Sequence, residues 1–258
     1  MIDLLKLEFR RLFRAKSFYI CLASALVMGI LTAVVNKMLL NIVSSDEIAG
    51  AFGTIVQAPT AFSMLKTAGS ASLTSILALF ISIFVSEDYS GDMTIKNIYA
   101  KGQTRDTVFF AKFISTIASS FLMILACAVF SFAMGKILFG EWGEMGKNYV
   151  GSLFAELLIL FAYSTIYFAI AISLKKMGAA IAISIVASSL FGLVLQLADL
   201  IIKSENINLA DYWLDGRLSI LEQPNVTNGD LLAGFLVGAV ILLAFGAAGF
   251  LINRYTKR

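Results

Sequence analysis

Long apolar stretches alternate with short polar ones along the whole chain. Six of these stretches come close to the length at which a helix, rising about 1.5 Å per residue, crosses a hydrocarbon core of roughly 30 Å. They are apolar on every side instead of alternating every second residue, which favours helices over the strands of a barrel. The pattern predicts an all-α polytopic membrane protein with six transmembrane helices, at about residues 18–36, 68–86, 109–134, 149–174, 177–201 and 230–252.

The composition agrees with a membrane domain. Of the 258 residues, 59% are hydrophobic and 14% are charged, whereas soluble proteins average roughly 45–50% apolar and about 25% charged residues. No polar stretch is long enough to form a separate soluble domain. We therefore predict a single transmembrane domain over residues 1–258.

Basic residues set the predicted orientation. Most of the 20 Lys and Arg residues fall on the side that holds both termini, and positive charge is retained on the cytoplasmic side, so we predict cytoplasmic N- and C-termini. Residues 1–16 interleave apolar and basic positions, which predicts an interfacial helix on the inner leaflet. Each basic residue there adds roughly 1 kcal/mol of attraction to anionic membrane lipids. The predicted membrane-surface residues are Lys6, Arg10, Arg11, Arg14 and Lys16.

Several kinds of chemistry are missing from the sequence. The chain has no histidine, which is the commonest metal ligand and general base, and both cysteines lie in apolar stretches. A glycine-rich loop ending in Gly-Lys-Ser/Thr, the usual phosphate cradle, is also absent. We predict no catalytic residue, no metal site, no cofactor and no nucleic-acid partner for this chain. It is not expected to be an enzyme, and any use of ATP must occur in a partner.

The connection after the second stretch, residues 87–105, is the most informative segment. Ile95, Ile98 and Tyr99 follow an i, i+3, i+4 spacing, which places them on one face of a short helix. Gly91 and Gly102 bracket that helix as breakers. The segment is either a short helix with an apolar face for a partner or a solvated charged loop.

From this segment outward, the chain resembles the permease subunits of type-2 ATP-binding-cassette exporters, of the compact kind common in Gram-positive bacteria. In this chain Asp92 and Met93 separate Gly91 from Thr94, whereas the family often has this glycine and threonine adjacent. The resemblance also covers the basic N-terminal stretch, the six-helix layout and the basic C-terminal tail. The positions that match the family pattern are Glu87, Gly91, Thr94, Ile95, Lys96, Asn97, Lys101, Gly102, Arg105 and Lys112.

The resemblance implies partners and a way of working. Two permeases, identical or paralogous, would pair in a bacterial plasma membrane, each docked on a cassette ATPase subunit that binds ATP and Mg²⁺. A short cytoplasmic coupling helix would press into a groove of that ATPase, and the N-terminal helix would contact it as well. The exported substrate would be amphipathic, an antimicrobial peptide or a lipid-like molecule. The implied coupling residues are Glu87, Gly91, Ile95, Lys96, Ile98, Tyr99, Gly102 and Arg105.

Inside the membrane, Glu156 is the one carboxylate well within a predicted span, and Gln196 is expected at a similar depth. A charge there is costly, so Glu156 should face a cavity or a neighbour. The pair either lines the translocation path or forms a structural hydrogen bond between helices. Gly234 and Gly238 predict close helix packing in the last span. The outer connection at about 202–229 is either a membrane-surface cap or a substrate gate.

Two other functions stay open at this stage. A proton-coupled secondary transporter would use Glu156, but it predicts inverted repeats and broken helices that the sequence does not display. A nontransporting scaffold or sensor subunit would bind an ATPase without passing a substrate. Copurification with a cassette ATPase distinguishes the first of these from the exporter.

Overall fold

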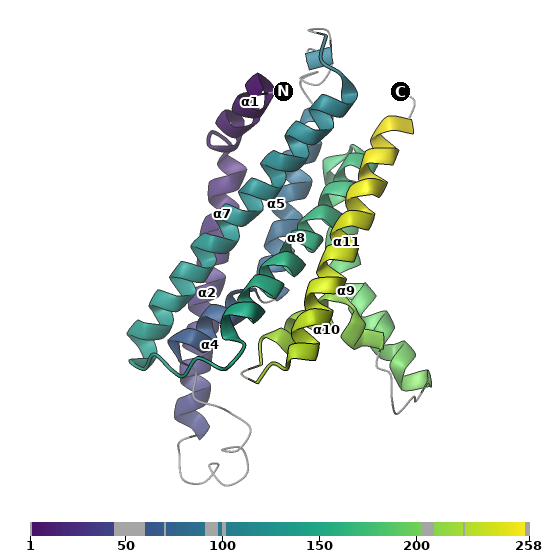
Figure 1. Cartoon of the computed structure of the whole chain (residues 1–258). Coiled ribbons are helices and arrows are strands. Elements are labelled where there is room, and N and C mark those ends of the chain that lie inside the picture. The colour runs from purple at the N-terminus through teal and green to yellow at the C-terminus, as the bar shows by residue number, and fades with distance from the viewer. Residues whose placement is uncertain are drawn as a thin grey trace.

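The computed structural model describes residues 2–43, 60–69, 71–90, 98–99, 102–202, 209–223 and 225–255, and every regular element in these ranges is a helix. The all-α prediction with six spans is confirmed, because six helices are long and apolar enough to cross a membrane. Both termini lie at the same end of the bundle (Figure 1), which we call the termini end. The six helices are α2 (Lys16–Val43), α5 (Ala71–Ser90), α7 (Arg105–Phe139), α8 (Tyr149–Leu174), α9 (Met177–Ile202) and α11 (Asn228–Tyr255).

The observed bounds of α5 and α7 differ from the predicted ones. Helix α5 starts later than expected because the residues before it form the separate helices α4 (Ala61–Lys66) and η1 (Thr67–Gly69). Thr60 and Ser63 begin α4 with a reciprocal capping box. Helix α7 is longer than predicted, since Thr104 caps its start and Gly140, at a φ of 75°, ends it in the left-handed region.

Helices α8 and α9 join through the shortest turn between spans. Helix α8 begins and ends where the hydropathy pattern predicts, and α9 starts at the predicted Met177 after two connecting residues. Lys175 closes α8 with a φ of 55°, and its backbone N–H donates to the Ala171 carbonyl at 3.1 Å. This sharp reversal sends α9 back along the bundle, and Figure 1 shows α9 diverging from α8 toward its far end.

Helices α5 and α8 form the inside of the bundle. In each of them 67% of the spanning residues are buried, compared with 12% in α9 and 11% in α11. Close contact between α8 and α11 depends on small residues, as predicted: a Cβ on Gly234 would lie 3.6 Å from the Ala155 Cβ, and one on Gly238 would lie 3.4 Å from the Ile159 nitrogen. The outer sides of α9 and α11 therefore remain available to lipid.

Short helices occupy the two ends of the bundle (Figure 1). Helix α1 (Ile2–Leu12) lies at the termini end, next to α7. Helices α4, η2 (Leu209–Tyr212) and α10 (Leu214–Leu221) lie at the opposite end. Gly135 allows α4 to pack closely against α7, because a Cβ at this position would lie 2.9 Å from the Ala61 Cα. Helices α1, α4 and α10 carry the buried charged residues Glu8, Lys66 and Arg217.

Candidate functional site

Residues 87–105 run from the last turn of α5 to the start of α7, at the termini end. Glu87 is exposed in the last turn of α5, and Arg105 is exposed at the start of α7. Gly102 has a φ of 81°, and its N–H donates to the Tyr99 carbonyl at 2.9 Å, a turn that glycine favours. Gly91, Ile95 and Lys96, which the sequence places in the same segment, lie outside the described residues.

Ile98 and Tyr99 attach this segment to the rest of the chain. Both side chains are half-buried, and they pack against Leu4 of α1 and against Val108 and Ala111 of α7. The sequence predicts that these two residues present an apolar face to a partner. In the structure, both side chains contact the chain's own helices α1 and α7, and a role in binding a partner stays a prediction.

Four charged side chains from three helices meet where α5 ends and α7 begins. Asp88 of α5 pairs with both Arg11 of α1 and Lys112 of α7. The Lys112 Nζ lies 3.5 Å from one carboxylate oxygen of Glu8, and an Arg11 nitrogen lies 3.8 Å from the other. Glu8 and Lys112 are each 1% exposed, and Asp88 is 5% exposed. We call Glu8, Arg11, Asp88 and Lys112 the buried ion cluster.

The buried ion cluster is electrically balanced, with two cations and two carboxylates. A single buried ion costs several kcal/mol of desolvation, and good pairing offsets this cost. Arg11 makes further contacts: it donates to the Phe84 carbonyl at 3.2 Å, lies 5.2 Å from the centre of the Phe84 ring, and reaches the exposed Glu87 at 3.3 Å. The cluster therefore holds α1 and the ends of α5 and α7 at a fixed spacing.

The membrane-surface prediction needs one correction. Lys6, Arg10, Arg14 and Lys16 are exposed, but Arg11 turns inward to Asp88. Its neighbour in the cluster, Glu8, was not predicted as a site residue, and neither was Asp88. A signal for Glu8 exists in the sequence, because Leu4, Glu8 and Leu12 recur every four residues and form the buried stripe of α1.

At the opposite end, Glu156 and Gln196 are not brought together. Glu156 on α8 is 4% exposed and faces the side of α4 and α7, where it lines a groove with Leu65 and Phe121. Gln196 is exposed on α9. Within the described part of the chain, Oε1 of Glu156 has no hydrogen-bond partner. A role for either residue along a translocation path stays a prediction.

Lys66 is a cation close enough to Glu156 to interact with it electrostatically. Its side chain is buried, at 3% exposure. Its Nζ donates to the carbonyls of Leu221 at 3.0 Å and Gln223 at 2.8 Å, at the C-terminus of α10, where a positive charge is favourable. Burial lowers the pKa of Lys66, although the charges of Glu156 and Glu222 oppose that shift. Burial raises the pKa of Glu222 to about 7, with Lys66 opposing it.

Helix α10 packs into the bundle. Its Leu214, Leu218 and Leu221 are at most 4% exposed, and α10 contacts both α8 and α11. Asp215 accepts a hydrogen bond from the Tyr163 hydroxyl of α8. Burial raises the pKa of Asp215, and this hydrogen bond opposes the shift. Helix α10 lies in the outer connection at about 202–229, for which a membrane-surface cap or a substrate gate is predicted. The apolar side of this helix packs against other helices of the bundle.

A comparison with known protein families identifies the class of protein to which this bundle belongs. The sequence model of a family described as "ABC-2 family transporter protein" matches residues 4–192, from α1 into α9. The chain belongs to this family. No curated protein matches the sequence. The chain is thus an ABC transporter permease, a multi-pass protein of the cell membrane, and permeases of this family act with an ATPase subunit.

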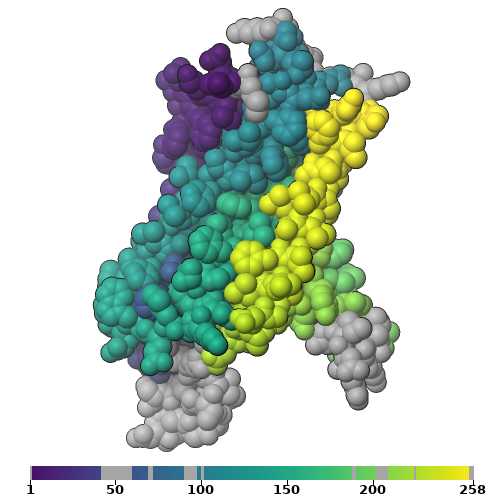
Figure 2. Space-filling view, viewed as in Figure 1, coloured from purple at the N-terminus to yellow at the C-terminus, as the bar shows by residue number. Residues whose placement is uncertain are grey.

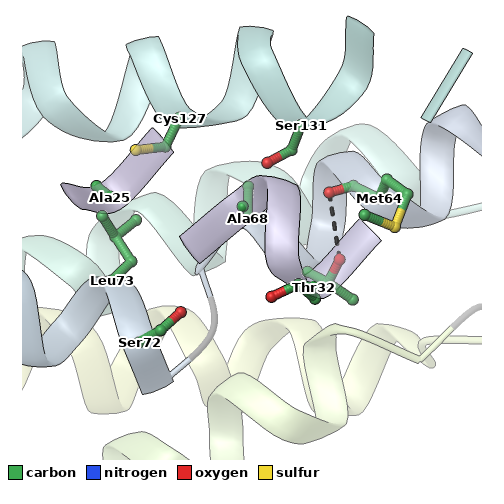
Figure 3. Close-up of a pocket in the computed structure, with 10 residues that line it drawn as sticks. Ala25, Thr32, Met64, Ala68, Ser72, Leu73, Cys127 and Ser131 are labelled. Carbon is green, nitrogen blue, oxygen red and sulfur yellow. Dashed lines mark hydrogen bonds between the residues drawn. The ribbon is translucent and has the colours of Figure 1, made fainter. Parts of the chain in front are cut away.

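The permease also encloses a small polar cavity between α2, η1, α5 and α7 (Figure 3). Thr32, Ser72, Cys127 and Ser131 contribute to its lining, and Thr67 Oγ1 donates to the Met64 carbonyl at 3.2 Å beside it. Its volume of about 20 Å³ matches a single water molecule. The cavity is too small for a transported substrate.

Proposed function

We propose that the permease exports an amphipathic substrate, an antimicrobial peptide or a lipid-like molecule, from the cell or from its membrane. ATP and Mg²⁺ bind to the separate ATPase subunit. A second permease, identical or related, completes the pathway. The observation that carries the ATP-driven part of the proposal is the buried ion cluster, which joins α1, α5 and α7 at the segment expected to meet the ATPase. The substrate class rests on the exporters that the chain resembles.

The cluster supplies a mechanical route from the ATPase to the spans. Closure of the ATPase presses on residues 87–105, which continue directly into α5 and α7. Because breaking a buried ion pair costs about 3–5 kcal/mol, the helix ends move together instead of bending locally. Asp88 is the central member, since it pairs with a cation from each of the other two helices. Rigid movement of packed helices is an established form of switching.

Surface charge supports the same arrangement. Lys6, Arg10, Arg14 and Lys16 are exposed on or next to α1, where they are suited to the anionic inner leaflet. Helix α1 would thus contact the membrane surface on one side and the buried ion cluster on the other. It would link the lipid surface to the spans. Export, as opposed to uptake, rests on the exporters that the chain resembles.

The test uses the permease reconstituted with its ATPase partner in proteoliposomes. Ile98→Glu introduces a charge where residue 98 packs against α1 and α7. The matched control, Gln103→Glu, introduces the same charge at an exposed position of the same connection. We expect Ile98→Glu to leave assembly and ATP hydrolysis intact while transport falls at least about tenfold, and Gln103→Glu to behave as wild type.

Three results overturn the proposal. Unchanged transport in an assembled Ile98→Glu complex removes the coupling role of this segment. Transport that continues without ATP and follows a proton gradient indicates the secondary transporter. A complex that hydrolyses ATP but moves no amphipathic substrate in either direction indicates the scaffold or sensor.

A further inference from the structure

A groove of about 360 Å³ lies between α7 and α8, on the face shown in Figure 2, where the two helices run side by side. This volume falls in the range of small-ligand sites, roughly 300–1,000 Å³. Among the described residues that line it, Glu156 is the one polar side chain, and all the others are apolar. The groove therefore combines a hydrophobic wall with a single carboxyl group.

The groove opens sideways, toward the region that lipid occupies. Phe121 and Leu125 of α7 are 39% and 49% exposed at its mouth, and Val150 and Phe154 of α8 are each 59% exposed. All four belong to membrane-spanning helices. The mouth of the groove thus lies on the lipid-facing side of these two helices, and its wall suits an apolar chain.

Glu156 is the feature that an apolar chain alone does not explain. It is 4% exposed, and its Oε1 has no hydrogen-bond partner within the described residues. Lys66 is close enough to affect it electrostatically, but its two hydrogen bonds go to carbonyls of residues 221 and 223. Lys66 also faces a second carboxyl group, Glu222. The ammonium group of Lys66 is therefore shared electrostatically between two carboxyl groups, of which Glu156 lines the groove.

We propose that this groove binds a cationic amphiphile, with the alkyl chain between α7 and α8 and a protonated amine at Glu156. The inference rests on the proposed function in taking such a ligand as the transported class. An ammonium group donates a charge-assisted hydrogen bond to a carboxylate and neutralises a buried charge. A hydroxyl group gives only a neutral hydrogen bond, and a carboxylate on the ligand would be repelled.

The experiment is competition photolabelling of the purified permease in lipid nanodiscs, without the ATPase or ATP. The probe is a long-chain alkylamine that carries a diazirine in its chain, and labelled peptides are mapped by mass spectrometry. Competitors are dodecylamine, dodecanol and dodecanoate. We expect labels on α7 and α8 at the groove, and about 10- to 100-fold weaker competition by dodecanol than by dodecylamine, from loss of the charged hydrogen bond.

Three variants separate the parts of the site. Glu156→Gln keeps the side-chain shape and should reduce the advantage of the amine over the alcohol to within about threefold. Ala128→Phe fills the groove and should remove labelling by the chain, whichever head group it carries. The matched control, Glu144→Gln, removes the same charge at an exposed position of the α7–α8 connection and should change neither.

Equal competition by amine and alcohol overturns the inference, and so does an unchanged amine preference in Glu156→Gln. The Phe154→Cys variant tests whether a second permease covers the groove. If the groove is not labelled and this variant forms a disulfide between two copies, the groove is a permease–permease contact and the inference is overturned. ATP-driven movement of the amine is measured separately in the reconstituted complex. Labelling without such movement leaves the binding site established and refutes export of this class.

Discussion

Replacing Asp88 by Asn is expected to loosen the termini end of the bundle more than any neighbouring charge removal. Asp88 pairs with Arg11 and Lys112, and Lys112 is 1% exposed. Removing one partner of a buried ion pair costs about 3–5 kcal/mol, because the other charge stays buried. Glu8 remains 3.5 Å from Lys112 and retains part of the pairing. We therefore expect the lower part of that range, about 3 kcal/mol.

The assay is thermal unfolding of the purified permease at constant detergent and salt. About 3 kcal/mol corresponds to a fall in Tm of roughly 6–12 °C for a chain of this size. Glu87→Gln is the matched control, because it removes the adjacent carboxylate, which also contacts Arg11 but is exposed. An exposed pair contributes about 0–1 kcal/mol, so its Tm should fall by no more than about 4 °C.

A double variant distinguishes buried charge from lost packing. Asp88→Asn combined with Lys112→Met removes the ion that the single change leaves without its main partner. Apolar replacement of buried pairs is often neutral, so the double variant should be more stable than Asp88→Asn alone. If Asp88→Asn is no more destabilising than Glu87→Gln, or if the double variant shows the sum of both losses, the account of the cluster is wrong.

Three further predictions use the same unfolding assay. The pKa of Glu222 is raised from 4.5 to about 7. Its contribution to the free energy of unfolding is therefore full below pH 4.5 and is lost as the pH rises to about 7. Glu222→Gln should flatten this decline, and a variant whose stability follows the same pH profile as the wild type contradicts the prediction. Gly135→Ala forces a Cβ against the α4 backbone and should cost about 1–3 kcal/mol, whereas Gly178→Ala meets nothing within 4 Å and should be nearly neutral. Tyr163→Phe removes the hydrogen bond to Asp215 and should cost about 1–3 kcal/mol, and an unchanged Tm rejects that role.

The sequence identifies the segment that joins α5 and α7 but does not resolve what its side chains contact. Ile98 and Tyr99 were identified through helical spacing, which reports a shared face. The spacing does not say what covers that face. The structure places Val108, Ala111 and Leu4 against them. Leu4 lies nearly a hundred positions away in the chain, so no local pattern encodes that contact.

Charged residues show the same division. Basic content predicts a membrane-surface role for Lys6 and Arg10, and both side chains are exposed in the structure. Arg11 belongs to the buried ion cluster because its position on α1 faces α5, which depends on how the two helices dock. Likewise, Glu156 was found as a charge within a span, but its expected neighbour Gln196 is exposed on the diverging α9.

By itself, the sequence determined the six membrane-spanning helices, their order and approximate bounds, the lack of a nucleotide-binding loop and the resemblance to transporter permeases. These properties follow from length, hydropathy and short motifs, which act over a few helical turns. Only the tertiary structure decided which charges pair and where a groove opens. Ion pairs such as Asp88 with Arg11 and the α7–α8 groove at Glu156 depend on helix rotation and tilt, which packing between distant segments sets.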